Sequence, residues 1–129
     1  MHILLLEDHG ESRDIIAKLL VHCGHTVTVA SNLAEASDLL GKMPFEVLLS
    51  DIGLPDGDAF QLVAEAKRSL PVMKTVALTG RATDEDRELS RQAGFDHFLT
   101  KPVDFHELRS LLEGEPGIPA KQRSEVGSQ

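Results

Sequence analysis

The chain has 129 residues, of which 41% are hydrophobic, a net charge of −8 and a single cysteine. This length fits one domain with an ordinary core, and one cysteine excludes an internal disulfide and is typical of a reducing, cytoplasmic setting. The acidic balance argues against a nucleic-acid surface, and no apolar run approaches the roughly 20 residues that cross a bilayer, so we expect neither nucleic-acid nor membrane contact.

Segments typical of strands and helices alternate from the first residues onward. Residues 3–6 form an apolar run, and an apolar stripe over 15–23 predicts a helix that ends at Gly24. Residues 26–29 alternate as a half-buried strand does, and 32–41 predict a helix that Asn32 caps. The inward face of the first helix is predicted to be Ile15, Ile16, Leu19, Leu20 and Cys23.

The second half of the chain continues the alternation. Residues 47–50 form a third apolar run, and Asp58 is expected to cap a helix that carries Phe60, Val63 and Ala64. The remaining predicted elements are a strand at 73–79, a helix that Thr83 caps and Gly94 ends, a short strand at 96–99, and a helix that Asp104 and Glu107 open.

Five strand–helix pairs in strict alternation predict an α/β fold with one parallel sheet and right-handed crossovers. The three continuous apolar strands should be central and the two weaker ones should be edges. The order 2-1-3-4-5, which is the flavodoxin-like doubly wound order, satisfies this. We expect one domain over residues 1–113, followed by a disordered tail or linker over 114–129, where apolar residues are few.

Polar side chains follow four of the predicted strands at the point where each strand ends. Because the carboxyl ends of parallel strands share one edge, these side chains should meet there. They are Glu7, Asp8, Asp51, Thr79 and Lys101. Two carboxylates about 4 Å apart repel by roughly 4 kcal/mol at an effective dielectric near 20, and a hard divalent cation such as Mg²⁺ (or Mn²⁺) offsets this best.

With such a cation bound, Asp51 can act as a nucleophile towards phosphorus and form an aspartyl-phosphate. Phosphoryl transfer needs charge neutralisation and positioning. Lys101 would bind phosphoryl oxygens, the Thr79 hydroxyl would donate to another, and the backbone N–H of Gly80 can approach because Gly80 lacks a side chain. The Gly53 carbonyl is a candidate further metal ligand, since the chain must turn back over the site.

Five short motifs together resemble the receiver domain of two-component response regulators. They are Glu7-Asp8, Ser50-Asp51, Leu54-Pro55-Asp56-Gly57, Ala77-Leu78-Thr79-Gly80 and Lys101-Pro102. The resemblance covers about residues 2–113. It implies metal ligands at Glu7 and Asp8, a phosphoacceptor at Asp51 and a metal-binding carbonyl at Gly53.

The resemblance also implies a switch and a partner. Thr79 would be the switch hydroxyl, Phe98 the switch aromatic, and Lys101 the phosphate-binding lysine, with a cis bond before Pro102. The mostly charged segment 83–93, with Leu89 and Ala93 as its apolar anchors, would be the movable helix. The partner would be a histidine kinase or a histidine phosphotransfer domain. Homodimerisation stays open. The residues in these motifs are most similar to those of receivers fused to hybrid sensor kinases.

Three other functions compete with this interpretation. An aspartyl-nucleophile phosphatase of the haloacid-dehalogenase type would need an acid two residues after the nucleophile, where this chain has Gly53. A flavodoxin-like cofactor binder would need a phosphate-cradling loop where Glu7-Asp8 stands. A degenerate receiver used only for protein contacts would not need the complete acidic, Thr and Lys set.

Two groups of histidines have weaker claims to a function. The stretch from His22 to His25 suggests a zinc site, but Cys23 completes the apolar stripe and no second ligand pair is nearby. His9 is close to the acidic pair and is interpreted as a solvated loop residue.

Overall fold

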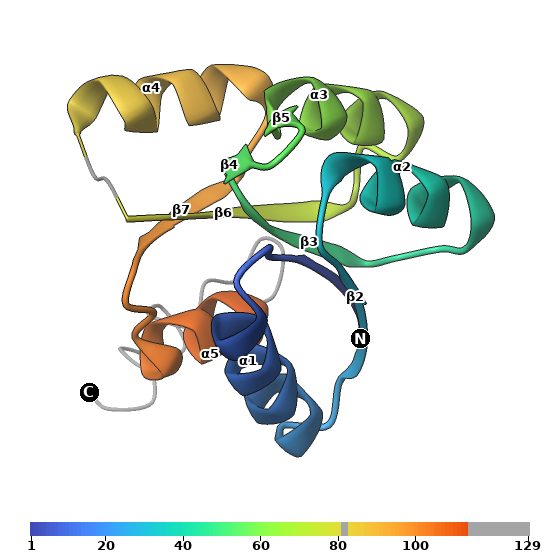
Figure 1. Cartoon of the computed structure of the whole chain (residues 1–129), viewed down its shortest axis with the longest axis vertical. Coiled ribbons are helices and arrows are strands. Elements are labelled where there is room, and N and C mark those ends of the chain that lie inside the picture. Colours follow the sequence, from blue (N-terminus) through green and yellow to red (C-terminus); the bar gives the residue numbers. More distant parts are fainter. Residues whose placement is uncertain (81–82, 114–129) are drawn as a thin grey trace, which may run out of the picture.

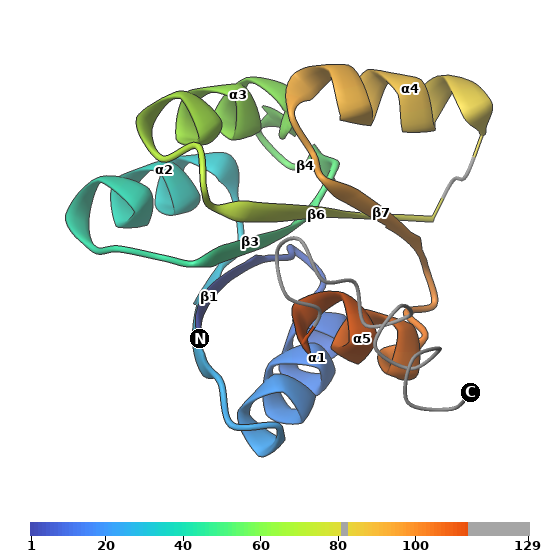
Figure 2. The same cartoon turned by 180° about the vertical axis from the view of Figure 1, so that it is seen from behind.

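A computed structural model of the chain describes residues 1–80 and 83–113, so the tail expected over 114–129 lies outside the described residues. A parallel sheet forms the centre of the molecule, with α1 and α5 against one face and α2, α3 and α4 against the other (Figures 1 and 2). The elements are β1 His2–Leu6, α1 Gly10–His22, β2 Thr26–Ala30, α2 Leu33–Lys42, β3 Val47–Asp51, β4 Gly53–Leu54, β5 Gly57–Asp58, α3 Phe60–Ser69, β6 Lys74–Thr79, α4 Asp84–Ala93, β7 His97–Thr100 and α5 Phe105–Glu113.

The order of the parallel strands is β2-β1-β3-β6-β7. Counted without the short β4–β5 hairpin, this is the predicted order 2-1-3-4-5, with the two weaker strands at the edges. The antiparallel hairpin pairs Gly53 with Asp58 and Leu54 with Gly57, and it was not predicted. None of the helices in the described parts of the chain is long and apolar enough to cross a membrane.

Burial on both faces explains why the central strands are continuously apolar. In β1, Leu4 and Leu6 face the core under α2 and α3, whereas Ile3 and Leu5 face the core under α1 and α5. All four side chains are completely buried. Each such side chain contributes roughly 1.5–3 kcal/mol relative to exposure, so the two cores fix both the sheet and the helix layers around it.

The predicted helix ends are largely confirmed. Asn32 accepts a hydrogen bond from the Glu35 N–H at 2.8 Å, and Thr83 accepts one from the Asp86 N–H at 3.1 Å. Gly94 ends α4 with a φ of 118°, a left-handed conformation that favours glycine. By contrast, α2 runs one residue past Gly41, to Lys42, and the N-cap of α3 is Ala59, with the Asp58 carboxylate accepting from the Phe60 N–H.

The predicted inner face of α1 is wrong in part. Ile16 and Leu20 are buried, but Ile15 is 53% exposed and Leu19 is 37% exposed. Ile15 and Leu19 precede the buried pair by one position each, which rotates them by about 100° away from the sheet. They form an apolar strip on the outside of the helix.

Two other helix faces also differ from the prediction. In α3 the buried residues are Leu62, Val63 and Ala66, so of the predicted Phe60, Val63 and Ala64 only Val63 is buried, while Phe60 is partly buried against the core. In α4, between Asp84 and Ala93, the one buried residue is Ser90, and Leu89 is 43% exposed instead of anchoring the helix. The expectation that α4 has few buried contacts is therefore confirmed, although the anchoring residue is different.

A polar network holds β7 and α3 to the far end of β6, away from the carboxyl edge of the sheet. Lys67 donates to the Asp96 carboxylate at 2.9 Å and to the Met73 carbonyl at 2.8 Å. The same Asp96 oxygen accepts the backbone N–H of the completely buried Thr75 at 2.9 Å. Burial alone would raise the pKa of Asp96, but the Lys67 ammonium and the Thr75 N–H outweigh it and lower that pKa.

This network predicts a pH-dependent contribution to stability. Replacing Asp96→Ala should lower the free energy of unfolding at pH 7 by about 1–2 kcal/mol, because the buried Thr75 N–H loses its acceptor. Because the folded-state pKa of Asp96 is depressed, its contribution is present above the unfolded pKa and is lost as pH falls through the folded pKa. Urea unfolding followed by far-UV circular dichroism, at pH 7 and near pH 3, measures the free energy of unfolding of the wild type and of Asp96→Ala under each condition. If the free energy of unfolding of Asp96→Ala falls below that of the wild type by the same amount at both pH values, the lowered pKa of Asp96 is contradicted.

Candidate functional site

The carboxyl ends of four strands meet at one cleft of about 300 Å³, as the sequence predicted. Asp51 is the last residue of β3, Thr79 is the last residue of β6, and Lys101 directly follows β7. Glu7 and Asp8 directly follow β1. The cleft is lined by Asp8, His9, Asp51, Ile52, Gly53, Leu78, Thr79, Gly80 and Lys101.

Lys101 joins two of the acids. Its ammonium lies 2.5 Å from Asp51 Oδ1 and 2.8 Å from Glu7 Oε1. Glu7 is completely buried, Asp51 is 5% exposed and the Lys101 side chain is 26% exposed, so both ion pairs are largely shielded from water. Burial opposes the charge of Lys101, yet the hydrogen bonds to Asp51 and Glu7 outweigh it and raise the pKa of Lys101. The ammonium therefore stays charged and holds three strands together at this edge.

The two acids that contact Lys101 also contact each other. Burial, with the neighbouring Glu7 carboxyl next in importance, raises the pKa of Asp51 to about 7. Burial also opposes ionisation of Glu7, but hydrogen bonds from Asp51, Lys101 and the His9 N–H outweigh it and lower its pKa. One ammonium thus does not fully relieve the crowding of negative charge, and a cation in the cleft would relieve it further.

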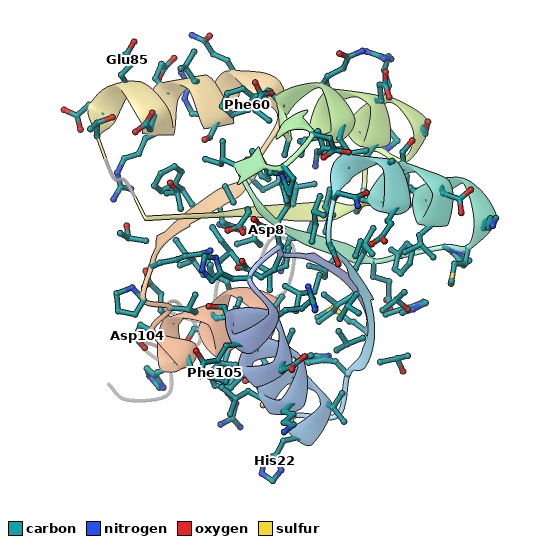
Figure 3. All side chains as sticks on the ribbon, in the orientation of Figure 1. Asp8, His22, Phe60, Glu85, Asp104 and Phe105 are labelled. Atoms are coloured by element: carbon teal, nitrogen blue, oxygen red, sulfur yellow. The ribbon has the colours of Figure 1, made fainter. Side chains whose placement is uncertain are left out.

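The two members of the acidic pair have different surroundings. Asp8 is exposed and lines the cleft, and Figure 3 shows it at the end of β1, between the two helix layers. The Glu7 side chain does not line the cleft and lies against Lys101 and the His9 N–H, which donates to it at 3.1 Å. Asp8 is therefore the more accessible of the two predicted metal ligands.

The residues at the cleft suit a hard divalent cation. Asp8, Asp51 and Gly53 all line it, and carboxylate and carbonyl oxygens are the ligands that Mg²⁺ prefers, together with water. Potential ligand atoms of Glu7, Asp8 and His9 lie within 4.8 Å of one another. His9 is exposed, as expected of a solvated loop residue close to the acidic pair, and it also lines the cleft. His22 lies at the opposite end of α1 and points away from the sheet (Figure 3).

The two predicted switch residues, Thr79 and Phe98, differ in their relation to this cleft. Thr79 and Gly80 line it, whereas Phe98 is half-buried and packs against the core under α2 and α3. The guanidinium carbon of Arg87, on α4, lies 4.8 Å from the centre of the Phe98 ring, which is within cation–π range. The predicted cis bond between Lys101 and Pro102 is confirmed.

Two residues that the sequence analysis passed over hold the surrounding loops. Arg13 donates to the Glu7 carbonyl at 3.1 Å and to the Ser31 hydroxyl at 3.2 Å. Asp56 accepts the backbone N–H groups of Leu33 and Ala34 at 2.9 and 3.1 Å. In the sequence, Pro55-Asp56-Gly57 indicates only a turn, and no local signal shows which distant helix Asp56 contacts.

The chain is similar in sequence to proteins of two kinds. It is 40% identical over 116 residues to an uncharacterized 14.6 kDa protein of Leptolyngbya boryana, with 88% of each chain covered. It is 28% identical over 112 residues to the sensor histidine kinase RcsC of Salmonella typhi, covering 87% of this chain and 12% of the kinase. The chain thus corresponds to a small part of that longer relative.

Solved structures of receiver domains are similar to the chain in both sequence and fold. The receiver domain of a sensor histidine kinase from Pseudomonas aeruginosa, solved with magnesium coordinated in its active-site cleft, is 29% identical, with a TM-score of 0.77 over 87% of this chain and 93% of that one. A CheY-like receiver domain protein of Methanospirillum hungatei is 28% identical, with a TM-score of 0.82 over 96% and 97%. The family model of the response regulator receiver domain matches residues 3–113, and the chain belongs to this family.

Proposed function

We propose that Asp51 accepts a phosphoryl group from a phosphohistidine. The observation that carries this proposal is the contact of the Lys101 ammonium with both Asp51 and Glu7, at the wall of an open cleft. A buried carboxylate paired with lysine and open to solvent on one side is suited to attack an incoming phosphorus atom. The glycine at position 53, where a haloacid-dehalogenase phosphatase would need its acid, gives no support to that alternative.

The proposed transfer forms one bond to phosphorus and breaks another. An Asp51 carboxylate oxygen forms a bond to phosphorus while the bond between phosphorus and the donor imidazole nitrogen breaks, and the imidazole leaves with that electron pair. Lys101 would neutralise charge that builds up on the phosphoryl oxygens, and Thr79 and Gly80, which line the same cleft, would donate hydrogen bonds to them. The chain's own residues thus position and neutralise the group during the transfer.

A divalent cation completes this site in our proposal, since the oxygen donors of Asp8, Asp51 and the Gly53 carbonyl fit Mg²⁺ or Mn²⁺. When bound, such an ion neutralises phosphoryl charge and orients the reacting group. Glu7, which is buried and does not line the cleft, would contribute indirectly, because it fixes the position of the Lys101 ammonium next to the ion. A cytoplasmic location belongs to the same proposal, and the single cysteine supports it.

Receiver domains interact with histidine kinases or phosphotransfer proteins, and we propose that α1 supplies the docking surface here. Ile15 and Leu19 lie four residues apart on its exposed face, at an apolar groove of about 240 Å³ that Val103 and Phe105 also line. Lys101 borders the same groove. A partner that brings a phosphohistidine to Asp51 must cover this surface, and an apolar helix of the partner would fit the groove.

We further propose that phosphorylation acts on α4 through Thr79 and Phe98. A phosphoryl group adds roughly −1.5 to −2 charges at Asp51 and attracts the Thr79 hydroxyl. The space that Thr79 leaves would accept the Phe98 ring, which then loses its contact with Arg87. Because α4 buries only Ser90 of its own residues, little free energy opposes its displacement.

The phosphoacceptor assignment predicts a covalent adduct. Incubating the chain with acetyl phosphate and Mg²⁺ should add one phosphoryl group, seen as a single mass increase in intact-mass spectrometry under cold, neutral conditions. Asp51→Asn should show no adduct, and EDTA should abolish labelling of the native chain, because the transfer depends on the cation. Equal labelling of Asp51→Asn would place the acceptor elsewhere and contradict the proposal.

The docking surface predicts a defect that is specific to protein donors. With a phosphorylated histidine phosphotransfer protein as donor, Ile15→Glu should slow transfer by about tenfold, the effect of losing roughly 1.4 kcal/mol of apolar contact. Labelling by acetyl phosphate should not change, because that small donor needs no docking surface. Val21→Glu is the matched control, since Val21 is 56% exposed on the same helix but does not line the groove. Equal defects in both variants would exclude the groove.

The switch predicts that a phosphate mimic changes α4. Adding beryllium fluoride with Mg²⁺ should alter amide hydrogen exchange across Asp84–Ala93 and shift the NMR resonances of the Phe98 ring, because both depend on the position of Thr79. Asp51→Asn serves as the control and should not respond. If the native chain binds the mimic while α4 exchange and the Phe98 resonances stay constant, the switch must be rejected.

A further inference from the structure

The β4–β5 hairpin carries Gly53 to the cleft, and its tip is attached to a distant helix. Its base is fixed by backbone hydrogen bonds from Ile52 to the Leu78 carbonyl at 3.2 Å and from Ala59 to the Ile52 carbonyl at 2.8 Å. Figure 1 shows the hairpin on the side of the sheet that α2, α3 and α4 cover. The hairpin has only two residue pairs of its own, so contacts at its tip decide where it lies.

The tip contacts the first turn of α2 in two independent ways. The two carboxylate oxygens of Asp56 accept the N–H groups of Leu33 and Ala34, donors that a helix leaves unsatisfied at its start. The next residue, Gly57, has a φ of 138°, and a Cβ added there would lie 3.2 Å from the Leu33 side chain. The hairpin therefore packs directly against the start of α2, and Asp56 fixes it there with charge-assisted hydrogen bonds.

The same corner of the chain also contacts the other acidic loop. Ser31, directly before the Asn32 cap, accepts a hydrogen bond from Arg13, which also donates to the Glu7 carbonyl. The segment Ser31–Ala34 is thus connected on one side to the loop that carries Glu7 and Asp8, and on the other to the hairpin that carries Gly53. These two loops supply the ligands of the proposed cation from outside β3.

We infer that Asp56 is a positioning residue for the divalent-cation site, which it serves by tying the hairpin, and with it the Gly53 carbonyl, to the start of α2. This inference rests on the proposed function, because it requires a cation at Asp51. It gives Asp56 a role that neither the phosphoacceptor chemistry nor helix capping alone would require. It also makes α2 sensitive to the cation, since a contact that favours the bound state must in turn be favoured by binding.

The test is a Mg²⁺ titration of the full chain, labelled with ¹⁵N and followed by NMR, without any phosphoryl donor. Asp56→Ala should raise the Kd for Mg²⁺ by about three- to tenfold, less than the 10–100-fold typical of lost partners that bond a metal ligand directly. Asp56→Asn keeps one acceptor oxygen and should lie between the wild type and Asp56→Ala. Saturating Mg²⁺ should slow hydrogen exchange of the Leu33 and Ala34 amides in the wild type but not in Asp56→Ala.

Asn32→Ala is the matched control. It removes a cap from the same helix, because Asn32 bonds the Glu35 N–H, but it leaves the hairpin attached. It should loosen the first turn of α2 and leave the Kd for Mg²⁺ within about twofold of the wild-type value, since the Asn32 side chain bonds the Glu35 N–H of its own helix and Asp56 still bonds the Leu33 and Ala34 N–H groups. Circular dichroism of each variant establishes that the fold is retained, and Asp56→Asn carries the test if Asp56→Ala does not fold.

The outcomes separate the two proposals. A wild type that binds Mg²⁺, together with an Asp56→Ala chain that binds it equally well, would overturn the role of Asp56 and leave the phosphoacceptor assignment intact. Equal weakening in Asn32→Ala and Asp56→Ala would also overturn it, because loss of a helix cap would then suffice. A wild type that does not bind Mg²⁺ would contradict the proposed cation site and remove the basis of both proposals.

Discussion

The ammonium of Lys101, held between the carboxylates of Glu7 and Asp51, is the interaction on which the arrangement of this edge depends. It joins the ends of three strands that are far apart in the sequence. Glu7 is fully buried, and an ionised carboxylate there would be strongly unfavourable without its partner, since breaking a buried pair typically costs 3–5 kcal/mol. The lysine therefore stabilises the fold and at the same time supplies the charge that the chemistry requires.

The charge of the site follows from the same residues. Glu7, Asp8 and Asp51 are three acids against one ammonium, so full ionisation leaves two negative charges, which equals the charge of one divalent cation. Without a cation, burial and the neighbouring Glu7 carboxyl raise the pKa of Asp51, which favours the protonated form of that carboxyl. Because the accessible donors are oxygens of Asp8, Asp51 and Gly53, a hard cation is the better means of relief.

Much of the fold and of this edge could be predicted because the determinants are local. Continuous apolar runs mark strands buried on both faces, and a residue at the end of such a strand is placed on the shared edge by topology alone. Helix faces were less predictable. Ile15 and Leu19 continue an apolar stripe that periodicity assigns to the core, yet the face of α1 that contacts the core carries Ile16 and Leu20, with Ala17 packed beside them.

What sequence reasoning missed depends on contacts between distant segments. The short β4–β5 hairpin and the bond from Asp56 to α2 have no periodic signal, because a turn that contains Pro, Asp and Gly is compatible with many directions of its side chains. The same holds for the different roles of Glu7 and Asp8. Glu7 is buried beside Lys101 and Asp8 is exposed at the cleft, and the adjacent acids in the sequence carry no signal of which one faces solvent.

The distribution of buried contacts also suggests why this edge of the sheet can combine a fixed site with a movable helix. The strands β1, β3 and β6 are buried on both faces, and the acids at the ends of β1 and β3 share that rigidity. Within α4, by contrast, Ser90 is buried while Leu89 is largely exposed, and the contact of Arg87 with Phe98 is one of its links to the sheet. Displacing the strands would cost much more free energy than displacing α4. A change of charge at Asp51 can therefore move α4 more easily than it can move the strands. The response of the domain should therefore be directed to α4 by the packing itself, whatever partner reads it.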